Sequence, residues 1–403
     1  MSDEVLLWEW LEFAVRWLHV VTAIAWIGSS FYFIALDLGL IHRQHLPEGV
    51  KGEEWQVHGG GFYHIQKYTI APDNLPEHLT WFKWESYSTW LSGFALLAIV
   101  YYAGAELYLI DPAKADLSIA SAVLLSLGSL TIGWLAYNFL CRQMEGKSDT
   151  LLMVLLFVLI VIVSYTYDQI FSDRAALLHV GAFTATIMTA NVFFIIMPNQ
   201  RIVVADMKAG RVPDSIYGVI AKQRSTHNNY LTLPVVFLML SVHYPLAFAS
   251  EYNWLIAGLV FLMGVTIRHY FNTMHARKLA PNWTWLATAI IFIVIVWISG
   301  AEKTEPTEVA SLPPKALAFS EKAQFDDAVA IVQGRCSMCH AREPFYDGIH
   351  VAPGGVYLET EADIALNAWP IYVQSGVTHA MPPANVSFIT PEERRLLRAW
   401  FEG

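Results

Sequence analysis

The chain has 403 residues, of which 55% are hydrophobic and only 15% are charged, and its formal net charge is −10. A soluble globular protein carries about 25% charged residues, so this composition argues against a soluble protein. The negative net charge, without a basic aromatic surface, excludes nucleic acid as an expected partner.

The apolar residues are grouped in long blocks from the N-terminus to residue 300. A helix needs about 20 apolar residues to cross a membrane. By this criterion the sequence predicts eight membrane spans. They are residues 13–36, 87–110, 118–140, 150–168, 175–197, 230–249, 254–277 and 282–300.

Two of these segments are similar to each other. Residues 17–35 align with 177–195, which places His19 over His179. Membrane folds built by duplication often retain such weak internal similarity. We therefore expect the bundle to contain two four-helix repeats, although apolar helices can also resemble one another through composition alone.

The positive charges are distributed unevenly between the loops. Lysine and arginine are concentrated in loops 41–86, 141–149 and 198–229, whereas the short loops of the other side hold only Lys114 and Arg174. The positive-inside rule places the basic loops in the cytoplasm. We expect a multi-pass protein of the bacterial inner membrane, with the N-terminus and the C-terminal domain on the periplasmic side.

The composition changes after residue 300, where a polar, proline-containing stretch begins. Beyond it, the segment FDDAVAIVQGRCSMCH is expected to open a small domain with a helix, and TPEERRLLRAWFEG to close it with a second. Thr390 at the N-cap, Pro391 at the first helical position and Glu393 at the third form a predicted capping box. The expected domains are a transmembrane domain, a linker and a C-terminal domain, over residues 1–300, 301–322 and 323–403.

The C-terminal domain contains the sequence Cys336-Ser337-Met338-Cys339-His340. A C-x-x-C-H motif is typical of covalent haem c attachment, in which both thiols form thioethers and the histidine binds the iron. A zinc site would need a second ligand pair, and a thioredoxin-like dithiol would need a βαβ unit. Met381 is the expected sixth ligand, with His379 as the alternative. The predicted fold class is thus an all-α membrane helical bundle followed by a small class I-type cytochrome c domain.

Three histidines are predicted to lie in the outer half of the bundle. Histidines inside a membrane are costly to bury unpaired, and they often mark functional sites. His19 and His179 could be the axial ligands of a haem b, with His243 as a substitute ligand. The alternative is that these are hydrogen-bonded structural histidines without iron.

Polar side chains also occur near the inner ends of several predicted spans. Together they could surround a pocket for a small polar anion, although each residue alone could be an ordinary interfacial anchor. The candidate catalytic residues are Glu85, Arg224, His227, Asn228, Arg268 and His269. No nucleotide-binding glycine motif follows a strand, so the sequence predicts no site for nicotinamide, flavin or ATP.

Several stretches together resemble one known family. They are HVVTAIAWIGSSFYFIALD, FKWESYSTWLSG, RSTHNNYLTLPVVFLMLSVHYP, RHYF, CSMCHAREP and HAMPP. The chain resembles the bacterial membrane-bound urate oxidases, or urate hydroxylases, which join an eight-span membrane domain to a C-terminal cytochrome c. The resemblance implies that urate is oxidised to 5-hydroxyisourate, and that electrons pass to haem c rather than to oxygen. Cys336, Cys339, His340 and Met381 match the haem attachment and ligand positions.

The resemblance also implies partners, whereas the roles of residues in the membrane domain are inferred from the chemistry of their side chains. The partners are urate, membrane lipid and a downstream respiratory electron acceptor, either a cytochrome or a terminal oxidase. We expect His227 or Glu85 to be the general base, and Arg224 and Arg268 to bind the urate anion. The alternative functions are a quinol–cytochrome c electron-transfer protein and a non-enzymatic haem-bearing sensor or transporter.

Overall fold

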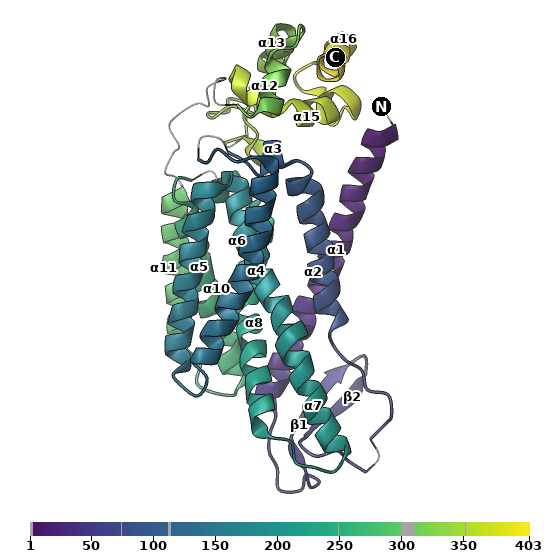
Figure 1. Ribbon diagram of the computed structural model, residues 1–403, viewed down its shortest axis with the longest axis vertical. Helices are drawn as coiled ribbons and strands as arrows, with labels where there is room; N and C mark the ends of the chain where they lie inside the picture. Colours follow the sequence, from purple (N-terminus) through teal and green to yellow (C-terminus); the bar gives the residue numbers. More distant parts are fainter. Residues whose placement is uncertain are drawn as a thin grey trace.

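Long apolar helices make up most of the molecule (Figure 1). The computed structural model describes residues 3–73, 75–111, 114–248, 250–299, 309, 312–350 and 352–403. The bundle contains the helices α1 (Asp3–Gly39), α2 (Trp84–Leu97), α3 (Ala105–Tyr108), α4 (Ile119–Gln143), α5 (Asp149–Ile170), α6 (Asp173–Ala190), α7 (Met197–Lys208), α8 (Ser215–Ser241), α9 (Pro245–Phe248), α10 (Asn253–His275) and α11 (Trp283–Ser299).

Five helical segments among the described residues are long and apolar enough to cross a membrane. They are Leu6–Gly39, Ile119–Gln143, Asp149–Ile170, Asp173–Lys208 and Asn253–His275. The last of the expected spans corresponds to α11, which is apolar but shorter.

Two expected spans differ from the structure in their helical boundaries. The one at 87–110 is α2, followed by a π-helical turn, η1 (Ala98–Tyr102), and the short α3. The one at 230–249 consists of the C-terminal part of α8, which begins much earlier, at Ser215, and ends at Ser241, followed by a turn and the short α9. The N-terminal half of α8 carries arginine, histidine and asparagine, and these lower its hydropathy.

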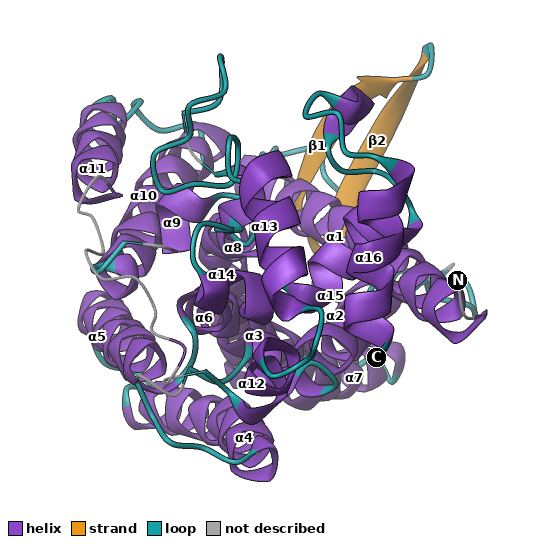
Figure 2. Ribbon diagram, turned by 90° about the horizontal axis from the view of Figure 1, so that it is seen from above, coloured by secondary structure: helices purple, strands orange, loops and turns teal. Residues whose placement is uncertain are grey.

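Neighbouring helices pack around a single large apolar core. Helix α8 lies between α6 and α10, and α10 also contacts α5 and α11, while α1 packs along α2 (Figure 2). Fully buried core side chains come from α4, α5 and α6 and from the loops beside them. They include Tyr137, Leu152, Phe171, Leu177 and Phe183.

A β-hairpin corrects the all-α prediction. The strands β1 (Val50–His58) and β2 (Gly61–Tyr68) pair antiparallel, and His58 lies opposite Gly61. Gly59 (φ 60°) and Gly60 (φ 78°) form the two-residue turn, where positive φ angles match the twist of the strands. The hairpin lies at the opposite end of the bundle from both termini (Figure 1).

The C-terminal part of the chain forms its own small helical core. Its longer helices are α12 (Pro314–Ser320), α13 (Phe325–Arg335), α14 (Glu361–Leu366) and α16 (Pro391–Glu402). Val332, Leu397 and Trp400 are 0% exposed in this core. The predicted capping box at Thr390 is confirmed, because its hydroxyl accepts from the Glu393 N–H and the Glu393 carboxylate accepts from the Thr390 N–H. The predicted linker lies partly outside the described residues, and its remainder contains α12.

Candidate functional site

A buried polar cluster lies between α4, α6, η2 (Asn191–Ile196) and α8. It is named here the Arg224 cluster, and it consists of Tyr137, Asn138, Asn191, Arg224, His227 and Asn228. Asn191 is 0% exposed and Arg224 is 3% exposed. The four-residue rise within α8 places Arg224 and Asn228 on one face of the helix, with His227 beside them.

Hydrogen bonds hold the cluster in one arrangement. Tyr137 Oη lies 2.9 Å from His227 Nδ1, and Asn191 Nδ2 donates to the same oxygen at 2.9 Å. Asn191 Nδ2 also donates to Asn228 Oδ1 at 3.0 Å. The phenol therefore connects the imidazole to the amide groups, so that the ring of His227 is fixed by its Nδ1 atom.

Arg224 carries a positive charge into this cluster without an acidic partner. Its Nη2 donates to Asn138 Oδ1 at 2.9 Å, its Nη1 lies 3.5 Å from Asn191 Oδ1, and its guanidinium lies 5.0 Å from the Tyr137 ring centroid. No carboxylate of the described residues forms an ion pair with it, and its buried Nε has no partner. Because a buried charge without a counter-charge is costly, this arrangement favours an anionic ligand.

A second arginine lies on another side of α8. The Arg268 cluster, as it is named here, consists of Phe31, Asn229, Arg268 and Asn272. Arg268 donates from Nη2 to Asn272 Oδ1 at 2.9 Å and to Asn229 Oδ1 at 3.2 Å. The guanidinium carbon of Arg268 lies over the Phe31 ring, 4.1 Å from the ring centroid. This arginine, too, has only neutral acceptors among the described residues.

The candidate catalytic residues are thus divided between two places. Arg224, His227 and Asn228 lie together, whereas Arg268 belongs to the second cluster. His269 is exposed and lies 3.3 Å from the Tyr230 hydroxyl. Glu85 forms no polar contact with either cluster in the described part of the chain, and its buried Oε2 has no partner.

Three members of the Arg224 cluster were missed by the sequence predictions. Tyr137 and Asn138 lie near the end of an apolar helix, and Asn191 lies in the middle of an apolar run. A polar side chain inside an apolar run is itself a signal of function, because its burial is costly. Asn191, which is 0% exposed, was detectable by that rule.

One family model, described as urate oxidase N-terminal, matches residues 5–299. The chain belongs to this family. The match includes both arginine clusters and points to a urate-related function. No curated protein and no solved structure matches the chain.

The predicted haem b is wrong. Both ring nitrogens of His179 are already hydrogen-bonded, Nε2 to Ser126 Oγ at 2.8 Å and Nδ1 to Ala175 O at 2.7 Å. The side chain is 0% exposed, so it leaves no lone pair and no room for iron. His19 Nδ1 lies 3.0 Å from Thr89 O, on a different helix pair. Both histidines are therefore structural residues held by hydrogen bonds, which was the alternative to haem ligation.

The predicted haem c is corrected as well. The described residues contain no group of three or more His, Cys, Asp or Glu that could hold a metal ion, and Cys336, Cys339 and His340 are among the residues searched. Cys336 is buried in the small core of the C-terminal part. No metal or haem ligand role is therefore carried forward for these residues or for Met381.

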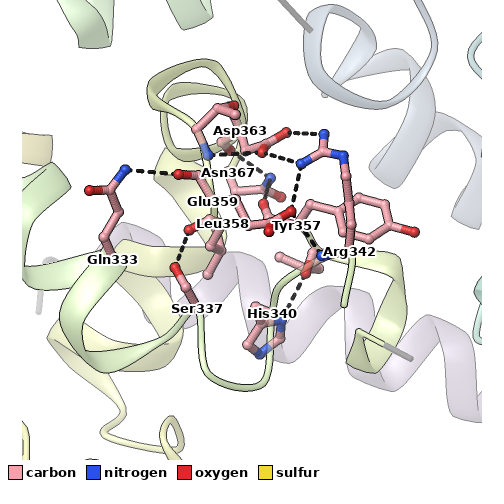
Figure 3. Close-up of polar contacts among 11 residues, drawn as sticks. Gln333, Ser337, His340, Arg342, Tyr357, Leu358, Glu359, Asp363 and Asn367 are labelled. Atoms are coloured by element: carbon pink, nitrogen blue, oxygen red, sulfur yellow. Dashed lines mark hydrogen bonds and ion pairs between the residues drawn. The ribbon is translucent and has the colours of Figure 1, made fainter. Parts of the chain in front are cut away.

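Ser337 and His340 of the C-x-x-C-H motif are hydrogen-bonded to the backbone of the loop 356–360 (Figure 3). His340 Nδ1 lies 2.8 Å from Val356 O, and the Ser337 hydroxyl donates to Leu358 O at 2.5 Å. Burial lowers the pKa of His340, which favours its neutral form. Arg342 donates to Asp363 and to Glu359, and its hydrogen bond to the Asp363 carboxylate raises the pKa of Arg342 above its ordinary value.

Proposed function

We propose that the chain oxidises urate to 5-hydroxyisourate in the Arg224 cluster. The observation that carries the proposal is the buried guanidinium of Arg224, which has no counter-charge and lies beside the His227–Tyr137 pair. Urate is an anion at neutral pH, so it would supply the missing negative charge. Membership of the urate oxidase N-terminal family supports this choice of substrate.

The reaction balances without oxygen as a reactant. The urate monoanion and one water give 5-hydroxyisourate, one proton and two electrons, with a new bond between the water oxygen and C5. The electrons pass to a respiratory electron carrier, which is the oxidant. Arg224 holds the urate anion, and after the two electrons have left it stabilises the negative charge that the ring gains as the hydroxide formed from water adds at C5.

His227 is the proposed general base. In the tautomer that this role requires, Nδ1–H donates to the Tyr137 oxygen and leaves Nε2 free to take the proton from water. Asn191 donates to the phenol oxygen and to Asn228 Oδ1, so Asn228 holds Asn191 in place and Asn191 fixes the phenol beside the imidazole ring. Glu85 is the alternative base, since its Oε2 is buried and unpartnered.

We also propose eight membrane spans in two four-helix repeats, with both termini and the separate domain 323–403 in the periplasm. Helix α1 packs along α2 as α6 packs along α8, which supports the repeat. The N-terminus and the C-terminal helices lie at one end of the molecule and the hairpin at the other (Figure 1). The basic loops lie at the hairpin end, which the positive-inside rule assigns to the cytoplasm.

Urate consumption by membranes tests the proposed function. Membranes that contain the chain, and matched membranes without it, are mixed with urate and an artificial electron acceptor in the absence of oxygen. We expect urate to disappear only where the chain is present, with two electrons transferred per urate. Intact protein that consumes no urate with any acceptor, including the cell's own respiratory carriers, would refute the proposal.

A further inference from the structure

A cavity opens at the hairpin end of the bundle, between the C-terminal ends of α1 and α10 and the N-terminal half of α8. We call it the vestibule. Its polar lining residues are Asp37, Lys222, Thr226, Tyr230, His269, Asn272, Thr273 and Lys278. Since Asn272 also belongs to the Arg268 cluster, the vestibule reaches that cluster directly.

The vestibule carries an excess of positive charge. Lys222 and Lys278 line it and Arg268 lies behind it, whereas Asp37 is its only lining carboxylate among the described residues. Lys222 and Lys67 both form ion pairs with Asp37, which neutralises that carboxylate. A concave surface of one sign attracts ions of the opposite sign, so the vestibule favours anions.

The Arg268 cluster provides hydrogen-bond donors that the protein itself does not use. Asn229 is 0% exposed, and its Nδ2 has no partner. Its Oδ1 accepts from Arg268 and from Asn272 Nδ2, so the amide cannot turn over without losing those bonds. A buried donor without an acceptor is costly, which points to a ligand oxygen at this position.

The donors that remain free limit the chemistry of the ligand. The guanidinium carbon of Arg268 lies over the Phe31 ring, 4.1 Å from the ring centroid, so this aromatic ring covers one side of the group. Arg268 Nη1 makes no hydrogen bond to the described residues, and together with Asn229 Nδ2 it offers two donors. Carbonyl oxygens on the edge of a planar ring would accept from such donors.

We propose that the vestibule and the Arg268 cluster form an entrance site that admits planar oxopurine anions from the hairpin side and selects them before they reach the Arg224 cluster. This inference rests on the proposed function for the identity of the anion. Asn228 and Asn229 are neighbours on α8, so the two clusters flank the same helix turn. The entrance site binds substrate and takes no part in the chemical step.

Steady-state kinetics separates entrance from catalysis. Arg268→Gln and Asn229→Ala are compared with Arg211→Lys, a change at an exposed arginine that does not line the vestibule. We expect both test variants to raise KM for urate about tenfold while kcat is retained, because each loses about one hydrogen bond to a charged group. The control should change neither KM nor kcat. An unchanged KM in both folded variants would overturn the inference.

Thiol labelling tests the same site without removing a buried charge. The test variant is Thr226→Cys in the vestibule, and the control is Val212→Cys, whose native side chain is 80% exposed. A membrane-impermeant thiol reagent is added from the hairpin side, and the native protein gives the background labelling. We expect urate to protect position 226 and not position 212. Labelling of position 226 that urate leaves unchanged would contradict the entrance site. Loss of urate consumption by the native membranes would instead refute the proposed function.

Discussion

Two buried arginines without acidic partners dominate the chemistry of the bundle at the residue scale. Arg224 is held by amide oxygens and by the face of Tyr137, and Arg268 by Asn229, Asn272 and Phe31. A neutral amide stabilises a guanidinium without cancelling its charge. The positive charge therefore remains available to an anionic substrate.

Replacement of His227 tests the general base. His227→Gln should lower kcat about 100-fold or more while KM changes little, because proton transfer by a positioned side chain typically contributes that much. The rate of urate loss at saturating urate measures the effect. His42→Ala, at an exposed histidine of the hairpin end, is the matched control. Full turnover by the His227 variant would move the base to Glu85.

Replacement of Arg224 tests anion binding in the reaction centre. Arg224→Gln removes the charge and keeps two amide donors, so it should weaken urate binding by about 10- to 100-fold, as the loss of a hydrogen bond to a charged group does. Unlike the vestibule variants, it should also lower kcat, because Arg224 is proposed to act in the transition state. A variant with native kcat would place the reaction elsewhere.

At the scale of elements, close helix contacts fix the polar clusters in position. A Cβ added to Gly133 of α4 would lie 1.9 Å from a ring carbon of Phe183 on α6, whereas nothing lies within 4 Å of such an atom at Gly128. Phe183 is 1% exposed, so the added atom would force its ring to move within the core. The approach of α4 to α6 brings Tyr137 to Asn191, so this glycine supports the site.

Paired glycine substitutions test that approach. Gly133→Ala should destabilise the bundle by about 1–3 kcal/mol, the usual cost of overpacking a core. Gly128→Ala on the same helix should be neutral or slightly stabilising. Thermal unfolding in detergent compares them. Equal melting temperatures of the two variants would contradict the close contact.

The acid sensitivity of the C-terminal part depends on Glu393. Burial opposes its charge, but two hydrogen bonds from Arg335 at 2.9 and 3.0 Å outweigh that effect and hold the pKa of Glu393 below its ordinary value of 4.5. A lowered carboxyl pKa stabilises the fold above 4.5, and this stabilisation is lost as the pH falls through the lower folded value. Glu393→Gln should flatten the dependence of unfolding on pH in this range. An unchanged pH profile would contradict the assignment.

The elements differ in how well the sequence predicts them. The helix at Pro391 was predictable because its capping box is local, and five of the expected spans correspond to long apolar helices. No hairpin was predicted at His58-Gly59-Gly60-Gly61, although a two-residue glycine turn between alternating segments is a hairpin signal. Arg224, His227 and Asn228 were predicted because they lie close in sequence. Their partners Tyr137, Asn138 and Asn191 come from other helices, and only packing brings them together.

At the scale of the whole molecule, the two ends have different roles. The hairpin end carries the vestibule and the basic loops, and the other end carries both termini and the C-terminal helices (Figure 1). Substrate would therefore enter from the cytoplasmic side and react within the bundle.

Reporter fusions test this orientation. A reporter active only in the cytoplasm should function when inserted at Gly146, in a loop of the hairpin end, and should fail when fused to Gly403. A reporter active only in the periplasm should give the opposite result. Cytoplasmic activity at Gly403 would reverse the proposed direction of substrate entry.

The source of the added oxygen tests urate hydroxylation most directly. Membranes containing the chain are given urate and an electron acceptor in ¹⁸O-labelled water without oxygen gas, and the product is trapped rapidly for mass spectrometry. We predict 5-hydroxyisourate with one ¹⁸O atom from water and two electrons delivered to the acceptor, and a much slower formation of this product by His227→Gln membranes. The proposed hydroxylation by water would be contradicted if folded native protein left urate intact, or if the product formed only when oxygen gas is present.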